Sequence, residues 1–161
     1  STSKWLKRKA FAETMYRRLV RPRRYRTAWR QQQFCLVPVE RFFEPCWETG
    51  KAVPWSIHRQ DGEPFTVAAI WDRWTERATG EIVVSFSMLT INAEGHPIMG
   101  RFHRPGDERR SLVVVPPSRW TDWLSATPDT VRAMLAEMPV AEFTSESVMG
   151  LSSAPAQASF L

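Results

Sequence analysis

Short apolar segments fill the middle of the chain and predict a succession of strands. They are rich in aromatic and β-branched residues, and several alternate between apolar and polar positions, which is the period of a half-buried strand. The predicted strands are 33–39, 41–47, 53–59, 65–71, 82–91 and 111–115. An Asp-Gly pair within 60–64 predicts a hairpin turn, and a second turn is expected at 77–81.

Helical patterns lie on both sides of these strands. The expected helices are 10–20, 23–32, 118–124 and 128–138. Pro22 separates the first two because proline removes a helical hydrogen bond, while Thr127 is placed to cap the last one, with Asp129 in its first turn. Helices, then many short strands, then helices again predict an α+β fold with a curved, mostly antiparallel sheet.

Length and composition limit the classes of protein to which the chain can belong. With 161 residues, 43% apolar and 24% charged, the chain is predicted to form a single globular domain over 1–161 with a loose tail at 152–161. No apolar run approaches the roughly 20 residues of a membrane helix, and the basic start lacks the apolar region of a signal peptide. Two cysteines make no disulfide framework, which favours a reducing, cytoplasmic location.

The net charge of +5 is unevenly distributed along the sequence. Residues 1–30 carry eleven lysines and arginines against a single acid, Glu13, whereas acids outnumber bases after residue 111. Aromatic residues are interleaved with these basic residues: Trp5, Phe11, Tyr16, Tyr25 and Trp29. Such a mixture suits the phosphates and exposed bases of a single-stranded nucleic acid. A solvated helix face explains the same pattern, and the sequence leaves both interpretations open.

Glu44 is the first candidate for chemistry. In the predicted strand 41–47 it shares a face with Phe42 and Cys46, opposite Phe43. If the Phe42 face is buried, the carboxyl is desolvated and its pKa rises, which is the usual way to obtain an acid or base that works at neutral pH. If the other face is buried, Glu44 points to water.

His103 is the second candidate, because an imidazole can both take and give a proton near neutral pH. Neighbouring arginines would lower its pKa and could hold a phosphate, whereas Asp107 and Glu108 would raise its pKa. A charged surface turn is the alternative. His58 and His96 have no comparable surroundings and are expected to be structural or at the surface.

No metal site and no cofactor are expected, because the two cysteines and three histidines lack the usual ligand spacings. No glycine-rich phosphate loop or nucleophile elbow is present. Cys46 has no positively charged sequence neighbour that would lower a thiol pKa, and Cys35 in an apolar strand is expected to serve packing.

Several motifs, in this order along roughly residues 9 to 125, resemble the SOS response-associated peptidase family. The matching stretches are "AFAET" (10–14), "RRYRTAW" (23–29), "FCLVPVERFFEP" (34–45), "DGEPFTVAAIW" (61–71), "FSMLTINAEGHPIMGRFH" (86–103) and "RRSLVVVPPSRWTDWL" (109–124). The resemblance implies a barrel-like sheet with flanking helices. It also implies shielding of abasic sites in single-stranded DNA by a covalent crosslink.

The resemblance also implies roles for individual residues. An N-terminal cysteine, exposed by removal of the initiator methionine, condenses with the sugar aldehyde to give a thiazolidine. Glu44 matches the family glutamate that positions the amine and moves its proton, and His103 matches the histidine that protonates the sugar oxygen. The DNA-contacting side chains implied by the match are Lys9, Arg23, Arg24, Arg109 and Arg110.

The sequence departs from the family pattern at several positions. It begins Ser-Thr-Ser rather than with a cysteine, so we expect that the chain lacks an N-terminal segment with the nucleophile and cannot crosslink as given. Lys9 stands where the family has an asparagine, Phe11 where it has an arginine, and Pro45 where it often has a tryptophan. The protein is therefore expected to be a divergent member.

The expected partner is single-stranded DNA with abasic sites, bound by a monomer associated with the nucleoid and not with a membrane. Two alternatives stay open. The basic first third and the absent cysteine also fit a non-catalytic single-stranded nucleic-acid binding module. A peptidase that processes only its own N-terminus or other proteins is the third interpretation.

Overall fold

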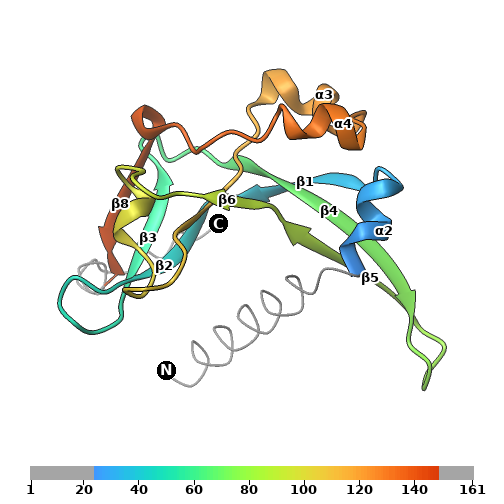
Figure 1. Ribbon diagram of the computed structural model, residues 1–161, viewed down its shortest axis with the longest axis horizontal. Helices are drawn as coiled ribbons and strands as arrows, with labels where there is room; N and C mark the ends of the chain where they lie inside the picture. The colour runs from blue at the N-terminus through green and yellow to red at the C-terminus, as the bar shows by residue number, and fades with distance from the viewer. Residues whose placement is uncertain (1–23, 149–161) are drawn as a thin grey trace, which may run out of the picture. The chain divides into compact units, whose positions relative to one another are not determined.

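The computed structural model describes residues 24–148, which form three small sheets and a few short helices (Figure 1). The strands are β1 (Phe34–Val39), β2 (Arg41–Cys46), β3 (Val53–Arg59), β4 (Phe65–Thr75), β5 (Ile82–Met88), β6 (Thr90–Asn92), β7 (Arg110–Leu112) and β8 (Phe143–Ser147). The α-helices are α2 (Arg24–Arg30), α3 (Trp120–Leu124) and α4 (Pro128–Arg132). The 3₁₀ helices are η1 (Met99–Arg101), η2 (Pro117–Arg119) and η3 (Val140–Glu142). The predicted mixture of antiparallel sheets and few helices is confirmed.

The chain divides into two compact units, each assembled from separate stretches of sequence. Within residues 24–148, the first unit comprises 24–37, 66–89 and 112–136, and the second comprises 38–65, 90–111 and 137–148. The interpretation of 1–161 as a single domain stays a prediction. The predicted helix at 10–20 and the loose tail at 152–161 lie outside the described residues.

The first unit contains the sheet with strand order β1-β4-β5. Residues 67–70 of β4 are buried, as the continuous apolar run predicts. Phe34 at the start of β1 packs edge-on against Trp29 and Trp123. The indole N–H of Trp123 donates to the carbonyl of Cys35 at 2.9 Å, which joins α3 to β1. This core is built from side chains of α2, β1, β4 and α3, of which only α2 and β1 are neighbours in sequence.

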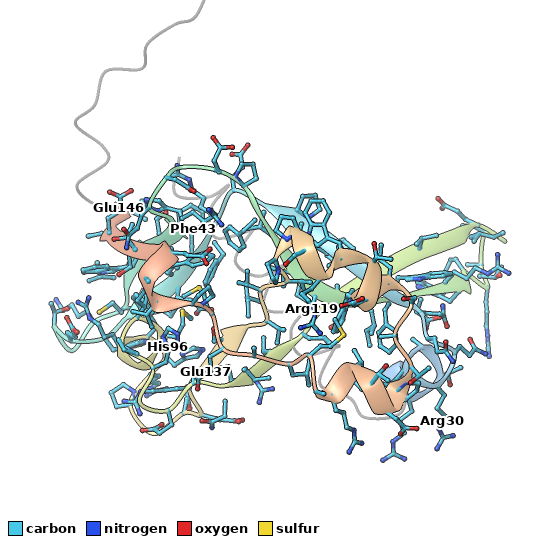
Figure 2. All side chains as sticks on the ribbon, turned by 90° about the horizontal axis from the view of Figure 1, so that it is seen from above. Arg30, Phe43, His96, Arg119, Glu137 and Glu146 are labelled. Atoms are coloured by element: carbon cyan, nitrogen blue, oxygen red, sulfur yellow. The ribbon has the colours of Figure 1, made fainter. Side chains whose placement is uncertain are left out.

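The second unit contains the antiparallel sheet with order β2-β3-β8. One face is apolar and is lined by aromatic contacts: Phe42 with Phe65, and Phe65 with Phe143. The opposite face carries Phe43, which is 51% exposed, and Glu146, two strands away in the same register (Figure 2). The Phe42 face is therefore the buried one, and this decides the question that the sequence leaves open for Glu44.

The family resemblance implies a barrel-like curved sheet. This prediction is wrong for residues 24–148, which form separate sheets of three, three and two strands. The predicted strand 82–91 breaks at Leu89, whose amide bonds to the carbonyl of Ala68 and whose carbonyl accepts from Val113. Of the predicted strand 111–115, only 111 and 112 belong to a strand, β7, and a single bridge joins Val114 to Val67. Two prolines follow that segment and prevent further pairing.

Two local predictions also need correction. The Asp-Gly turn forms, with Gly62 at φ 76°, but β3 and β4 on either side of it belong to different sheets, so there is no hairpin. The helix expected at 128–138 ends at Arg132, because its last turn tightens into bonds between residues three apart and the chain then becomes extended at Pro139. Strand β8 is not predicted, since only Phe143 in "FTSES" is apolar.

The predicted cap of α4 is confirmed, and it gives a first test of the fold. The Thr127 hydroxyl accepts from the Thr130 amide, and the Thr130 hydroxyl accepts from the Thr127 amide. We expect Thr127→Ala to lower the free energy of unfolding by about 1 kcal/mol, because it leaves an amide of the first turn without a partner. Urea denaturation measures this, with Ser118→Ala in exposed η2 as a control expected to change it by less than about 0.5 kcal/mol.

Candidate active site

Glu44 lies in the middle of β2 on the buried face of the sheet in the second unit. Its partner across the ladder is Trp55 of β3, and residues opposite each other in an antiparallel pair point to the same face. Burial raises the pKa of the Glu44 carboxyl from 4.5 to about 7. A carboxyl in this state exists in both protonation forms near neutral pH, which is what a proton-transfer group needs.

His103 directly follows Phe102, which is completely buried and forms an isolated antiparallel bridge with Cys46 at the end of β2. The backbone of His103 has φ 73°, a left-handed conformation that is uncommon for residues other than glycine. Its ring Nδ1 is buried and makes no hydrogen bond of good geometry within residues 24–148, although an interaction with the Phe102 backbone raises the pKa of the ring. His103 thus combines a strained backbone with a ring nitrogen that lacks a hydrogen bond of good geometry, a combination that clusters at functional sites.

Burial also sets the pKa of His103. It lowers the pKa below the usual 6.5, whereas an interaction with the Phe102 backbone and the charge of Asp107 raise it, and the charges of Arg109 and Arg110 lower it. These charge effects have the directions predicted from sequence, but desolvation is the largest. The imidazole of His103 is therefore mostly neutral at pH 7. At the same pH the Glu44 carboxyl on β2 is partly protonated.

The bridge between Cys46 and Phe102 brings the two candidates to one part of the second unit. Glu44 lies two residues before Cys46 on β2, and His103 lies one residue after Phe102. Because the bridge is antiparallel, the chain after Phe102 runs back along β2 in the direction of Glu44. The backbone therefore places a carboxyl and an imidazole on adjacent segments, 59 residues apart in sequence.

The arginines expected to bind phosphates already have protein partners. Arg109 forms hydrogen bonds of 3.0 and 3.1 Å with the carboxylate of Glu94. Arg110 contacts Glu108 at 2.8 Å and also donates to the hydroxyl and carbonyl oxygens of Thr90. Arg110 is thus anchored to β6, and a phosphate would have to compete with Glu94 or Glu108 for these guanidinium groups.

The other expected DNA contacts are not placed by the structure. Lys9 and Arg23 lie outside the described residues, and Arg24 begins α2 without a described side chain. Their roles stay predictions that rest on the sequence.

Sequence reasoning missed two pairs of side chains that flank the histidine turn. Arg101 lies over the ring of Trp55, with its guanidinium carbon 4.7 Å from the ring centroid, and Arg104 lies over Trp47 at 5.8 Å. No spacing in the sequence links these arginines to tryptophans about fifty residues earlier. The one available signal is the high tryptophan content, eight in the chain.

His96 is structural, as expected from its sequence surroundings. It is buried in the second unit (Figure 2), and its Nε2 donates to the carbonyl of Met138 at 2.7 Å. Its Nδ1 accepts from the amides of Ile98 and Met99. His58 lies on β3 with its Nε2 3.9 Å from a Glu146 oxygen.

We expect His96→Leu to lower the free energy of unfolding by roughly 2–3 kcal/mol, because it leaves a buried carbonyl and two amides without their partner. Chemical denaturation measures the change. His58→Gln is the matched control and should change stability by less than about 1 kcal/mol, since its ion pair is long and partly exposed. Equal losses in the two variants would contradict the structural role of His96.

Burial limits the reactivity of the two cysteines, and the spacing of side chains limits metal binding. Cys46 is buried, and burial raises the pKa of the Cys35 thiol. Among residues 24–148, no three side chains of His, Cys, Asp or Glu are close enough to hold a metal ion together. No helix in the same residues is both long and apolar enough to cross a membrane.

Comparisons with known proteins agree with the family resemblance of the sequence. The family model of the SOS response associated peptidase (SRAP) matches residues 3–151. A solved protein from Bordetella bronchiseptica is 38% identical over 77% of this chain and 58% of its own length, with a TM-score of 0.73. A protein from Bacteroides thetaiotaomicron is 20% identical over 85% of this chain and 59% of its own, with a TM-score of 0.66, and thus shares the fold.

A phage-related protein from Bordetella bronchiseptica is 21% identical over 84% of this chain and 61% of its own, with a TM-score of 0.55. The chain therefore spans about three fifths of the length of these solved structures. No curated protein matches the sequence.

Proposed function

The chain belongs to the SOS response associated peptidase family, and from this membership we propose that the protein senses abasic sites in single-stranded DNA by crosslinking to them. Membership associates the protein with the SOS response. The observation that carries the chemical part of the proposal is that a carboxyl of raised pKa, Glu44, and a histidine with a strained backbone, His103, lie on adjacent segments.

The proposed reaction joins a cysteine at the N-terminus of the natural protein to the open-chain sugar of an abasic site. The α-amine adds to the aldehyde carbon, water leaves, and an imine forms. The thiol then adds to the imine carbon, and its proton passes to the nitrogen, which closes a thiazolidine ring. An α-amine suits this reaction because its pKa near 8 leaves a useful neutral fraction at pH 7.

Glu44 supplies and recovers the proton in this scheme. Its protonated carboxyl donates to the hydroxyl that leaves as water, and its carboxylate then takes the proton released by the amine nitrogen. A group of ordinary glutamate pKa would be almost entirely ionised at pH 7 and would be a poor acid, whereas a pKa of about 7 supports both half-steps.

His103 opens the sugar ring. Its neutral imidazole takes the proton of the sugar hydroxyl at the anomeric carbon and returns a proton to the ring oxygen, which frees the aldehyde. The lowered pKa of His103 favours the neutral form that this step begins from. The surroundings of each group thus suit a different role, because the Glu44 carboxyl retains its proton and the His103 imidazole loses its proton near neutral pH.

DNA binding in this proposal uses the basic side chains Lys9, Arg23, Arg24, Arg109 and Arg110. Arg109 and Arg110 would exchange Glu94 and Glu108 for phosphate oxygens, which bind guanidinium groups with similar bidentate geometry. These surface ion pairs are worth little in water, so the exchange costs about 1 kcal/mol or less per pair.

A denaturing gel with a single-stranded oligonucleotide that contains one abasic site tests the function. The full natural protein should give a heat-resistant adduct, and the intact oligonucleotide should give none. Binding without an adduct, with equal affinity for both strands and a steep salt dependence, would identify a non-catalytic nucleic-acid binding module instead. Cleavage of a protein substrate without any DNA adduct would identify a peptidase.

A further inference from the structure

We propose that Glu48, Arg101 and Trp55 form a clamp that holds the His103 turn against β2 and β3. Arg101 is the central positioning residue of this clamp. The clamp is a feature of the fold, and its value for catalysis rests on the proposed function of His103.

The His103 turn needs support from its neighbours. Its left-handed backbone is strained for a residue other than glycine and persists only where surrounding contacts impose it. The Nδ1 atom of the ring makes no hydrogen bond of good geometry within residues 24–148 that would fix the ring strongly. A single bridge, rather than a continuous ladder, connects this segment to β2.

Arg101 provides that support through three groups at once. Its Nε donates to one oxygen of Glu48 at 2.9 Å and a terminal nitrogen donates to the other at 3.1 Å. Its guanidinium also lies 4.7 Å from the centroid of the Trp55 ring. A guanidinium held at both carboxylate oxygens and over an aromatic face keeps one orientation, which a lysine ammonium would not.

Trp55 connects the Arg101 side chain to the segments that carry Glu44 and His103. The Phe102 ring, directly before His103, lies 6.1 Å from the Trp55 ring at a tilt of 56°. Trp55 is also the register partner of Glu44 on the same face of the sheet. Trp55 therefore contacts the Arg101–Phe102 pair with its ring and is paired with Glu44 across the β2–β3 ladder.

A second arginine–tryptophan contact supports the other side of the turn. Arg104 directly follows His103, and its guanidinium carbon lies 5.8 Å from the ring centroid of Trp47. Trp47 and Glu48 follow β2 in the loop to β3, so both arginines that flank Phe102 and His103 attach to the same hairpin. The clamp on the Arg101 side is the stronger because it also includes the ion pair.

Nuclear magnetic resonance of the histidine rings tests the clamp without any reaction. The chain has three histidines, so His58 and His96 serve as internal controls. In Arg101→Gln the ring signals of His103 should shift and broaden while those of His58 and His96 stay in place. Arg101→Lys should give a smaller change of the same kind. Arg59→Gln, which removes another arginine held by carboxylates in the second unit, should leave His103 unchanged.

Two results would overturn the clamp. One is an unmoved His103 signal in Arg101→Gln. The other is an equal displacement of all three histidines together with a lowered melting temperature, which would make Arg101 an ordinary stabilising residue. Glu48→Gln provides an independent variant, and it should move the His103 signal in the same direction as Arg101→Gln.

Crosslinking kinetics in the full natural protein separate the clamp from the proposed function. Arg101→Gln should slow adduct formation roughly tenfold, because a displaced catalytic group loses its alignment, while affinity for abasic DNA changes less than about twofold. If the parent protein forms no adduct but His103 still moves in the variant, the function fails and the clamp stands. If the parent reacts and Arg101→Gln reacts equally fast, the clamp fails and the function stands.

Discussion

Replacing Glu44 by glutamine is expected to make the protein more stable above pH 7 and, at the same time, to slow crosslinking by about a hundredfold. The two effects have one cause. The buried face that desolvates the carboxyl makes it a usable acid at neutral pH and also destabilises the folded protein once the carboxyl ionises.

The sign follows from the direction of the pKa shift. The folded protein binds the Glu44 proton more tightly than the unfolded chain does, so the contribution of this proton to stability is complete below about pH 4.5. It is lost as the pH rises through about 7. A shift from 4.5 to about 7 corresponds to roughly 3 kcal/mol. Glutamine has no charge to bury, and the variant should gain up to that amount relative to the parent at high pH.

Urea denaturation at several pH values measures the stability difference between Glu44→Gln and the parent. The difference should be smallest near pH 4.5 and should grow in favour of the variant up to about pH 8. Glu40→Gln, at an exposed position just before β2, is the control and should leave both stability and the crosslinking rate nearly unchanged. A Glu44→Gln variant that is less stable at every pH would show that the carboxylate is a favourable structural ion.

Substitutions of His103 are expected to affect the crosslinking rate and the stability of the fold in different ways. His103→Ala and His103→Gly should both reduce the crosslinking rate by about 10²-fold or more, because the proton-transfer group is lost. The glycine variant should nevertheless be more stable than the alanine variant by about 1 kcal/mol. The reason is that φ 73° is strained for alanine and unstrained for glycine.

The adjacent position supplies the matched comparison. Arg104 has no positive φ, so Arg104→Gly should be less stable than Arg104→Ala by about 0.5–1 kcal/mol, the reverse order. Thermal or chemical unfolding of the four variants measures both differences. If alanine were the better residue at both positions, the backbone at His103 would not be strained, and the account of the turn would be wrong.

Local features of this protein were predictable from the sequence because they depend on neighbouring residues. The bounds of β3, the break before β2 and the Thr127 cap follow from side-chain alternation, turn residues and capping chemistry. The choice of Glu44 and His103 came from residue type and from family resemblance, and the structure places both on adjacent segments of one unit.

Features that depend on distant residues were not predictable. The buried face of β2 is decided by aromatic partners from other elements, Phe65 and Phe102 among them. The Asp-Gly turn has ideal local chemistry, yet the strands beside it pair elsewhere, because strand partners are chosen by core packing over the whole unit. The left-handed backbone of His103 and the Arg101–Trp55 contact likewise have no signature in the local sequence.

Burial on β2 should keep the Glu44 carboxyl partly protonated at neutral pH, on a segment adjacent to that of His103. Carbon-13 NMR of the side-chain carboxyls in glutamate-labelled protein tests it most directly, with Glu44→Gln used to assign the signal. We expect a Glu44 titration midpoint of about 7. A midpoint near 4.5 would mean that the carboxyl is solvated and ionised at neutral pH, and it would contradict the account.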